Sequence, residues 1–348
     1  MARRGKAGGQ AVLEGVMMKS KTRYAIAVRR EDGSIVTQMR PNQTVRDKYK
    51  ILRLPIIRGV VNFVETLILS FQTLTYSAEA YGLEEEEPGK FEKWLNRKFG
   101  KSLADLAMVI GGVLGVALAV GLFILLPSFL SNLIFGALGV EGTVWRSLVA
   151  GIIKIGIFVL YIWAVSLMRD IRRTYEYHGA EHKTIFCYEA GDDLTVENVK
   201  KYRRFHPRCG TSFIFVMLII SILIYALPFI PWDNMLLHAL IKILLLPLII
   251  GIGFEFLMYA GKHDNVLVRI LSAPGLWMQR LTTREPDASQ IEVAIRAFKL
   301  SLYEEFPGTL EEYEAQKAKE AAETASAKEA PDASVKSDEG NAPSDKPE

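Results

Sequence analysis

Four apolar runs dominate the hydropathy pattern of this chain, and each is long enough to cross a membrane as a helix. They cover residues 103–130, 147–168, 211–231 and 236–260. A hydrocarbon core of roughly 30 Å requires about 20 residues of helix. Helices at the surface of a soluble protein keep a polar side, and these runs have almost none. The pattern therefore predicts a mainly α fold, a polytopic helical membrane protein whose four transmembrane helices lie within residues 103–260.

A weaker apolar stripe precedes these runs, in residues 55–82. Its apolar positions recur at helical spacing: Ile57, Val60, Val61, Val64, Leu67, Ile68 and Phe71. Polar residues, among them Arg58 and Glu65, occupy the other side of the same helix. Such a helix fits the membrane interface or a bundle interior better than a lipid-exposed span. A fifth crossing would also move the basic first 54 residues outside, so we expect an amphipathic or re-entrant helix at the cytoplasmic face.

Residues 1–54 predict a small β-rich cytoplasmic head. Two β-prone runs, 24–30 and 35–39, flank a turn sequence that contains Gly33, which is typical of a hairpin. The glycine-bounded segment 8–15 indicates only a turn.

The other segments differ in composition from the apolar runs. Residues 83–102 are expected to form a charged linker, and residues 261–313 a cytoplasmic segment with an amphipathic helix. In that segment the sequence Ala-Pro-Gly at 273–275 predicts a break, and Ser289 with Glu292 predicts a capping box. Residues 314–348 are rich in Ala, Lys, Glu, Ser and Pro, which predicts a disordered tail.

Loop charge predicts the orientation. The connection 169–210 carries nine Lys and Arg residues, the connection before it carries only Arg146, and residues 232–235 carry none. The positive-inside rule places both termini and the 169–210 connection in the cytoplasm. There both cysteines are expected to stay reduced. The net charge of +3 gives no indication of a nucleic-acid partner, and the basic residues fit contacts with the lipid bilayer instead.

The 169–210 connection also holds three of the five histidines and both cysteines. His178 and His182 are four residues apart and would share one face of a helix, with Glu181 beside them. This His-x-x-Glu-His spacing is the one used by the inverzincin class of zinc peptidases. It predicts a divalent metal site, with zinc as the first choice and Glu181 as general base. The alternative is that the two histidines contact lipid phosphates and bind no metal.

A catalytic zinc usually has three protein ligands and one open position. His206 and Cys209 bring the chain back to the same membrane face before the third apolar run, so His206 is the expected third ligand and Cys209 a possible fourth. A closed set of three histidines and one cysteine would be a structural site.

Accessory candidates lie further along the chain. Glu255 falls inside the fourth apolar run, where a carboxylate is costly and should have a partner. The metal site, Lys242 and Arg58 are the candidates for that partner. His263 and Asp264 follow the run on the same side, whereas His238 is expected to be an ordinary residue at the outer interface.

Four separated blocks carry a family resemblance. They are GGQAVLEGVMM at 8–18, YHGAEHKT at 177–184, HPRCGTS at 206–212 and QRLTTREP at 279–286. They resemble the YqhQ-like family of bacterial membrane proteins, often labelled predicted metal-dependent enzymes, over about residues 8–305. The resemblance implies a bacterial cytoplasmic-membrane protein and suggests that Glu14 and Arg280 cover the metal site.

These observations favour a metal-dependent hydrolase that acts at the membrane face on a peptide or a lipid-linked substrate. Two other functions stay open. One is a non-enzymatic membrane factor with a structural metal site. The other is a small transporter or ion pathway that uses Glu255, for which so few spans would call for a homo-oligomer.

Overall fold

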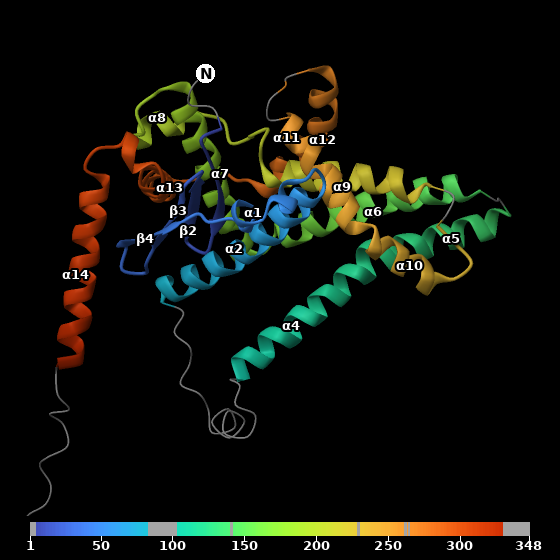
Figure 1. The fold of residues 1–348 in the computed structure, drawn as a ribbon, viewed down its shortest axis with the longest axis horizontal. Coiled ribbons are helices and arrows are strands. Elements are labelled where there is room, and N and C mark those ends of the chain that lie inside the picture. Colours follow the sequence, from blue (N-terminus) through green and yellow to red (C-terminus); the bar gives the residue numbers. More distant parts are fainter. Residues whose placement is uncertain are drawn as a thin grey trace, which may run out of the picture. The chain divides into compact units, whose positions relative to one another are not determined.

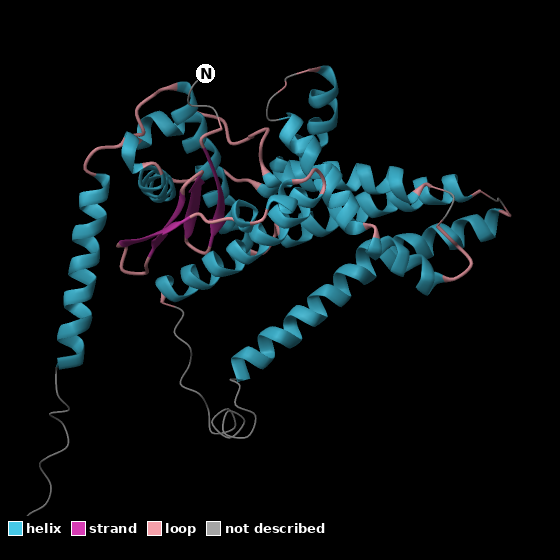
Figure 2. Cartoon of the chain, viewed as in Figure 1, coloured by secondary structure: helices cyan, strands magenta, loops and turns pink. Residues whose placement is uncertain are grey.

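The computed structural model describes residues 5–82, 103–139, 142–227, 230–260, 263 and 265–329, and its fold is mainly helical (Figures 1 and 2). The chain divides into two compact units, Met1–Ser301 and Leu302–Glu348. The expected charged linker at 83–102 and the candidate residue Asp264 lie outside the described residues.

A four-stranded antiparallel sheet forms the N-terminal head, in the order β1-β2-β3-β4. The strands are β1 (Ala7–Val12), β2 (Gly15–Ser20), β3 (Arg23–Arg29) and β4 (Ile35–Pro41). The hairpin expected around residues 31–34 is present as β3 and β4. Segment 8–15, for which only a turn was expected, belongs to a second hairpin that turns at Glu14, whose φ is +49°. The alternation of apolar and polar residues that usually marks a strand is hard to recognise in this hairpin, because β2 is buried almost throughout.

Both faces of this sheet are covered by helices. On one face, Met17, Ile26 and Val28 pack with Leu69 of α2 (Ile57–Tyr81). Side chains alternate along a strand, so Val16, Met18, Ala25 and Ala27, also buried, form the other face. This second face meets α13 (Ala288–Ser301), and β1 also contacts α7 (Arg169–Ala190). The head is therefore joined to helices that come from distant parts of the sequence.

Three helices in the described part of the chain are long and apolar enough to cross a membrane: Ile110–Leu138, Thr143–Val165 and Met235–Ala260. The first consists of the part of α4 (Leu103–Val120) from Ile110 onward, a π-helical turn η2 (Gly121–Leu125) and α5 (Leu126–Leu138). The second is α6 (Thr143–Val165), and the third joins α10 (Met235–Leu244) to α11 (Leu246–Ala260).

The fourth expected span is not confirmed. Residues 211–231 were expected to cross, but the helix there, α9 (Gly210–Tyr225), has only 16 residues. At 1.5 Å per residue it is about 24 Å long, short of a 30 Å hydrocarbon core. It packs against α6, α11 and α12 (Val266–Thr282). An apolar sequence of this length therefore also serves as a packing element among the other helices.

Helix α2 has the amphipathic character expected of residues 55–82. It follows the short helices α1 (Val45–Lys48) and η1 (Lys50–Arg53). Leu69 and Thr73 are buried, whereas Ile68 and Phe71 are 53% and 70% exposed. Helix α2 also packs on α11, and it is not among the three candidate spans of the described residues. An exposed apolar side of this kind is typical of a helix at a lipid interface.

Two local expectations for residues 261–313 are wrong. Helix α12 continues through Pro274, and the following Gly275 lies close against the backbone of Ser212 in α9. The capping box of α13 is built from Asp287 and Gln290: the Asp287 carboxylate accepts from the Gln290 N–H, and the Gln290 side chain accepts from the Asp287 N–H, both at 2.9 Å. Ser289, the expected N-cap, lies inside the first turn.

The second unit contains η3 (Tyr303–Glu305) and α14 (Thr309–Glu329). The disordered tail expected from residue 314 is thus helical up to residue 329, and residues 330–348 lie outside the described residues. Alanine, glutamate, glutamine and lysine are strong helix formers, which accounts for a helix that lacks a large apolar face. The short helix α8 (Val196–Lys200) completes the described elements of the first unit.

Candidate metal site

Helix α7 presents His178, Glu181 and His182 on one buried face. The ring centroids of the two histidines are 4.4 Å apart. Residues four apart meet on a helix because one turn takes 3.6 residues. Gly191 ends the helix in a left-handed conformation, with φ of +92°. The local sequence therefore determines this part of the site.

The chain returns to this face at Cys209, the N-cap of α9. One ligand atom from each of His178, His182 and Cys209 lies within 4.8 Å of the others. His178 Nε2 is 3.2 Å from the Cys209 Sγ atom. Cys209 and His182 are only 7% and 1% exposed.

Backbone carbonyls orient both imidazoles. His178 Nδ1 lies 2.9 Å from the Thr282 carbonyl oxygen, and His182 Nδ1 lies 2.5 Å from that of Arg204. A carbonyl oxygen only accepts hydrogen bonds, so each Nδ1 carries the proton and each Nε2 is left with a lone pair. Histidines that bind metals show this arrangement, in which the second ring nitrogen donates to a carbonyl or carboxylate.

Glu181 is buried beside the two histidines, with 4% of its surface exposed. Its Oε2 atom lies 3.9 Å from His178 Nε2 and has no hydrogen-bond partner among the described residues. Burial raises the pKa of this carboxyl to about 7, while His178 and the Gly9 N–H act in the opposite direction. An added Cβ at Gly9 would come within 3.1 Å of Glu181 Cγ, so glycine lets β1 approach this carboxylate closely.

His206 lies beside the group formed by His178, His182 and Cys209. Its ring centroid is 5.5 Å from that of His182, and its Nε2 is 4.0 Å from an oxygen of Glu189. Its Nδ1 accepts from the Arg208 N–H at 3.3 Å. The side-chain amide of Gln279, fully buried, accepts from the His206 N–H and donates to its carbonyl, both at 2.7 Å.

Glu189 is a residue that the sequence reasoning missed. Besides facing His206, its carboxylate forms an ion pair with Arg208. It follows His182 by seven residues, which is two helical turns and therefore the same face of α7. That spacing is the signal that could have identified it.

A cavity of about 570 Å³ opens on this group. Its polar end is lined by His178, Glu181, His182, Arg208 and Cys209, with β1 along one side. Its apolar part is lined by side chains of α9 and α11, namely Phe213, Ile214, Met217, Phe254 and Leu257. The cavity thus runs from an ionisable cluster to the surfaces of two apolar helices.

Three of the accessory candidates, Glu14, Arg280 and His263, do not line this cavity. Glu14 does not line it: its carboxylate accepts from Arg173 and from the Tyr177 hydroxyl, which ties the β1–β2 turn to α7 just before His178. Arg280 is exposed, next to the buried Gln279. His263 is exposed and stacks on Tyr259, with ring centroids 4.2 Å apart.

Glu255 is paired outside the cluster. Of the three partners considered for it, the structure brings Arg58 of α2, whose Nε donates to Glu255 Oε1 at 2.7 Å. The Ile56 N–H also donates to this carboxylate, at 3.3 Å. The ion pair joins the amphipathic helix α2 to α11 and accounts for a carboxylate within an apolar run.

Cys187, the other cysteine, is buried away from the cavity. Its thiol lies 3.5 Å from the Asp193 carbonyl oxygen. Burial and the nearby Asp192 and Asp193 raise the pKa of this thiol to about 11.

The four sequence blocks that carry the family resemblance meet at this site. Residues 8–18 form β1 and β2, residues 177–184 lie on α7, residues 206–212 supply Cys209, and residues 279–286 supply the carbonyl that orients His178. A family model described as a protein of unknown function (DUF1385) matches residues 54–304. The chain is also 36% identical to the uncharacterized protein YqhQ of Bacillus subtilis (strain 168) over 292 residues. This aligned region covers 84% of this chain and 90% of that protein. The chain belongs to this family. No solved structure matches it.

In this member of the family, Gly179 allows the closest approach of two blocks: an added Cβ would lie 2.0 Å from the Arg284 carbonyl oxygen. The family match begins at residue 54, after the sheet, whereas the identity to the Bacillus protein extends over most of the chain.

Proposed function

We propose that this protein is a metal-dependent hydrolase of the bacterial cytoplasmic membrane, with its active site at the cytoplasmic face. One divalent cation, zinc in the first instance, is held by His178, His182 and Cys209. Glu181 acts as general base, and the substrate enters through the cavity between the head and the apolar helices.

The observation that carries this proposal is the orientation of the two imidazoles. Both Nδ1 atoms are occupied by backbone carbonyls, so both Nε2 lone pairs are available to one ion together with the Cys209 sulfur. Zn–N and Zn–S distances of about 2.0 to 2.3 Å are compatible with three ligand atoms that lie within 4.8 Å of one another.

Three protein ligands leave one coordination position, and the cavity gives access to it. Zinc in such a site supplies Lewis-acid activation of water. The free Oε2 of Glu181, on the cavity wall beside His178, is positioned to take a proton from a nucleophile in the cavity. Gln279, whose side-chain amide bonds both backbone groups of His206, orients the 206–209 segment behind the ligands.

The lining of the cavity favours a lipid-linked substrate over a soluble peptide. Its apolar part is formed by helices α9 and α11, and α11 belongs to a candidate span. An acyl or prenyl chain would lie along Phe213, Met217 and Phe254, and the reacting group would then reach the ionisable end. Arg208, also on the wall, suits an anionic headgroup.

Metal content of the full-length protein in detergent tests the ligand set. We expect about one zinc per chain in the wild type and loss of zinc in His182→Ala. His263→Ala is the matched control, because His263 is exposed and stacks on Tyr259. Equal zinc content in the wild type and in His182→Ala would refute the metal site.

Cobalt substitution tests the sulfur ligand and the open position. A sulfur-to-cobalt charge-transfer band should be present in the wild type and in Cys187→Ser, and absent in Cys209→Ser. Added azide should change the cobalt spectrum if one position is open. A spectrum that azide leaves unchanged would indicate a closed structural site and would overturn the hydrolase proposal.

Turnover tests the base and the substrate class. With a p-nitrophenyl acyl ester in mixed micelles as probe, we expect hydrolysis to increase from acetyl to long acyl chains. Glu181→Gln should retain zinc and lose hydrolysis by about 10²-fold or more, the range for a general base. Loss of zinc in Glu181→Gln would instead make this residue a ligand or a structural partner.

A further inference from the structure

Two lysines are buried among the apolar helices, outside the segments that supply the metal-site residues. Lys154 lies at the middle of α6 and is 8% exposed, and Lys242 lies in α10 and is 3% exposed. Both helices belong to candidate spans. Charged lysines within a membrane-spanning helix are costly, usually face the bundle interior, and are candidates for a functional role.

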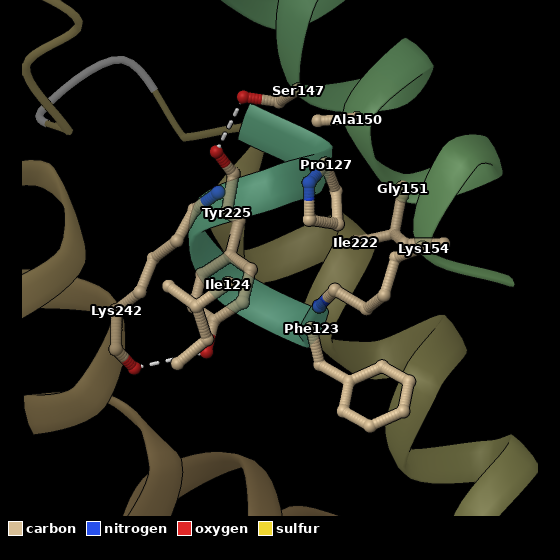
Figure 3. A pocket seen from close by; sticks show the side chains of 10 residues that line it. All are labelled: Phe123, Ile124, Pro127, Ser147, Ala150, Gly151, Lys154, Ile222, Tyr225 and Lys242. Atoms are coloured by element: carbon tan, nitrogen blue, oxygen red, sulfur yellow. Dashed lines mark hydrogen bonds between the residues drawn. The ribbon is translucent and has the colours of Figure 1, made fainter. Parts of the chain in front are cut away.

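The two ammonium groups converge on one aromatic ring. Lys154 Nζ is 4.8 Å and Lys242 Nζ 5.1 Å from the centroid of the Tyr225 ring on α9. Figure 3 shows the two side chains reaching Tyr225 from different helices. The ring faces offer a weak attraction for cations and no full negative charge.

Their hydrogen-bond partners are neutral. Lys154 Nζ donates to the Ser221 hydroxyl at 3.0 Å, and Lys242 Nζ donates to the Ser128 hydroxyl at 2.9 Å. Helices α5, α6, α9 and α10 and the turn η2 contain no aspartate or glutamate. Among the described residues, no carboxylate forms an ion pair with either lysine.

The serine hydroxyls near the lysines already donate their protons to backbone carbonyls. The Ser221 hydroxyl donates to the Leu218 carbonyl at 2.7 Å, and the Ser147 hydroxyl donates to the Tyr225 carbonyl at 2.7 Å. Each ammonium has three protons, and one of them is accounted for by a hydroxyl. Among the described residues, the space between the lysines therefore holds ammonium protons but no negatively charged acceptor.

That space is a small cavity of about 10 Å³, lined by both lysines, Tyr225, Ser147 and apolar side chains (Figure 3). A volume of this size holds roughly one water-sized particle. It excludes phosphate groups, carboxylate-bearing molecules and any organic ligand. The π-helical turn η2 supplies Phe123 and Ile124 to its wall, and such widened turns are frequent at functional sites.

We propose that Lys154 and Lys242 together bind a single monatomic anion of halide size, chloride in the first instance, inside the helical bundle. The anion lies in the cavity beside Tyr225 and accepts hydrogen bonds from both ammonium groups. It neutralises part of the charge that the lysines bring into the apolar region and joins α6 to α10. This site does not depend on the metal site.

Thermal unfolding of the full-length protein in detergent tests the anion. The wild type should unfold at a temperature several degrees higher in sodium chloride than in sodium gluconate of equal ionic strength, because gluconate is too large for the cavity. The stabilisation should saturate with chloride concentration, as expected for one binding site. Lys154→Gln and Lys242→Gln should each lose the chloride-dependent shift.

Lys183→Gln is the matched control, because Lys183 is a buried lysine whose ammonium is paired with Glu285. It should keep the full chloride-dependent shift, whatever its own unfolding temperature. An unfolding temperature that is equal in chloride and gluconate for the wild type would overturn the proposal and would indicate a water molecule or uncharged lysines in the cavity. A shift that persists in both cavity variants would overturn it as well.

Bromide provides a second readout that does not depend on the stability of any variant. In crystals of the wild type grown with sodium bromide, anomalous scattering should show a peak between the two Nζ atoms. Absence of that peak at full bromide substitution would contradict the proposal.

Discussion

Gly179→Ala tests the contact that joins α7 to the segment after α12. An ideal Cβ at residue 179 would lie 2.0 Å from the Arg284 carbonyl oxygen. Carbon–oxygen contacts of about 3.3 Å or more are the normal range, so the two backbones must separate by about 1 Å. The hydrogen bond from His178 Nδ1 to the Thr282 oxygen, now 2.9 Å, would stretch beyond the usual limit.

The energetic terms act in opposite directions. Alanine in place of glycine favours a helix by up to about 1 kcal/mol. Overpacking costs about 1–3 kcal/mol, and each lost hydrogen bond costs about 1 kcal/mol more. We therefore expect the free energy of unfolding to fall by roughly 1–3 kcal/mol. Loss of the carbonyl that orients His178 should weaken zinc binding by about 10- to 100-fold.

Thermal unfolding in detergent and competition with a chromogenic zinc chelator measure the two effects. Gly156→Ala is the control, because Gly156 lies in a helix and an added Cβ there meets no atom within 4 Å. Its stability should stay within about 0.5 kcal/mol of the wild type. If Gly179→Ala unfolds and binds zinc like Gly156→Ala, the close approach of α7 to residues 282–286 is wrong.

Two further predictions concern the cysteines and the cap of α13. In protein stripped of metal by a chelator, maleimide at pH 7 should label Cys209, which borders the cavity, faster than Cys187, whose raised pKa of about 11 keeps it a thiol. Labelling of Cys187 should increase as the pH rises toward 11. Mass spectrometry of Cys209→Ser and Cys187→Ser, each with one remaining thiol, measures both rates, and equal rates at pH 7 would contradict the difference in environment. Asp287→Ala should lower the free energy of unfolding by about 1 kcal/mol, and Ser289→Ala by less, because the Asp287 carboxylate accepts the Gln290 N–H at the helix start. A larger loss of stability in Ser289→Ala, measured by thermal unfolding, would restore Ser289 as the cap.

Local patterns along the chain were sufficient for several elements. The spacing of His178, Glu181 and His182 places them on one face of a helix, and α7 has that face buried. The hairpin of β3 and β4 follows from β-prone runs around a turn. The apolar runs predicted membrane helices, and three of them are long enough in the described residues. Such features depend on residues within a few positions of one another, so their physical cause is present in the local sequence.

Other features depend on contacts that no local pattern records. Hydropathy predicts α9 as a span, but this helix ends at Tyr225 after only 16 residues and packs against other helices of the chain. Helix α14 is a different case: composition predicts disorder after residue 314, whereas helix propensity, itself a local property, accounts for a helix that continues to Glu329. The hairpin of β1 and β2 was missed because β2 is buried almost throughout, which leaves no alternation between apolar and polar residues along it.

The sequence by itself predicted a helical membrane protein and placed His178 and His182 on one face of a helix. Hydropathy and helical spacing depend only on residues that are close together in the chain. Only the tertiary structure shows how the other two candidates lie around that pair: the sulfur of Cys209 lies 3.2 Å from His178, while His206 lies beside His182 and faces Glu189. It also supplied the carbonyls of Arg204 and Thr282 that orient the imidazoles, and the meeting of Lys154 with Lys242 at Tyr225. Backbone carbonyls are the same in every residue, and lysines 88 positions apart meet only when the helices pack, so the sequence carries no local sign of either.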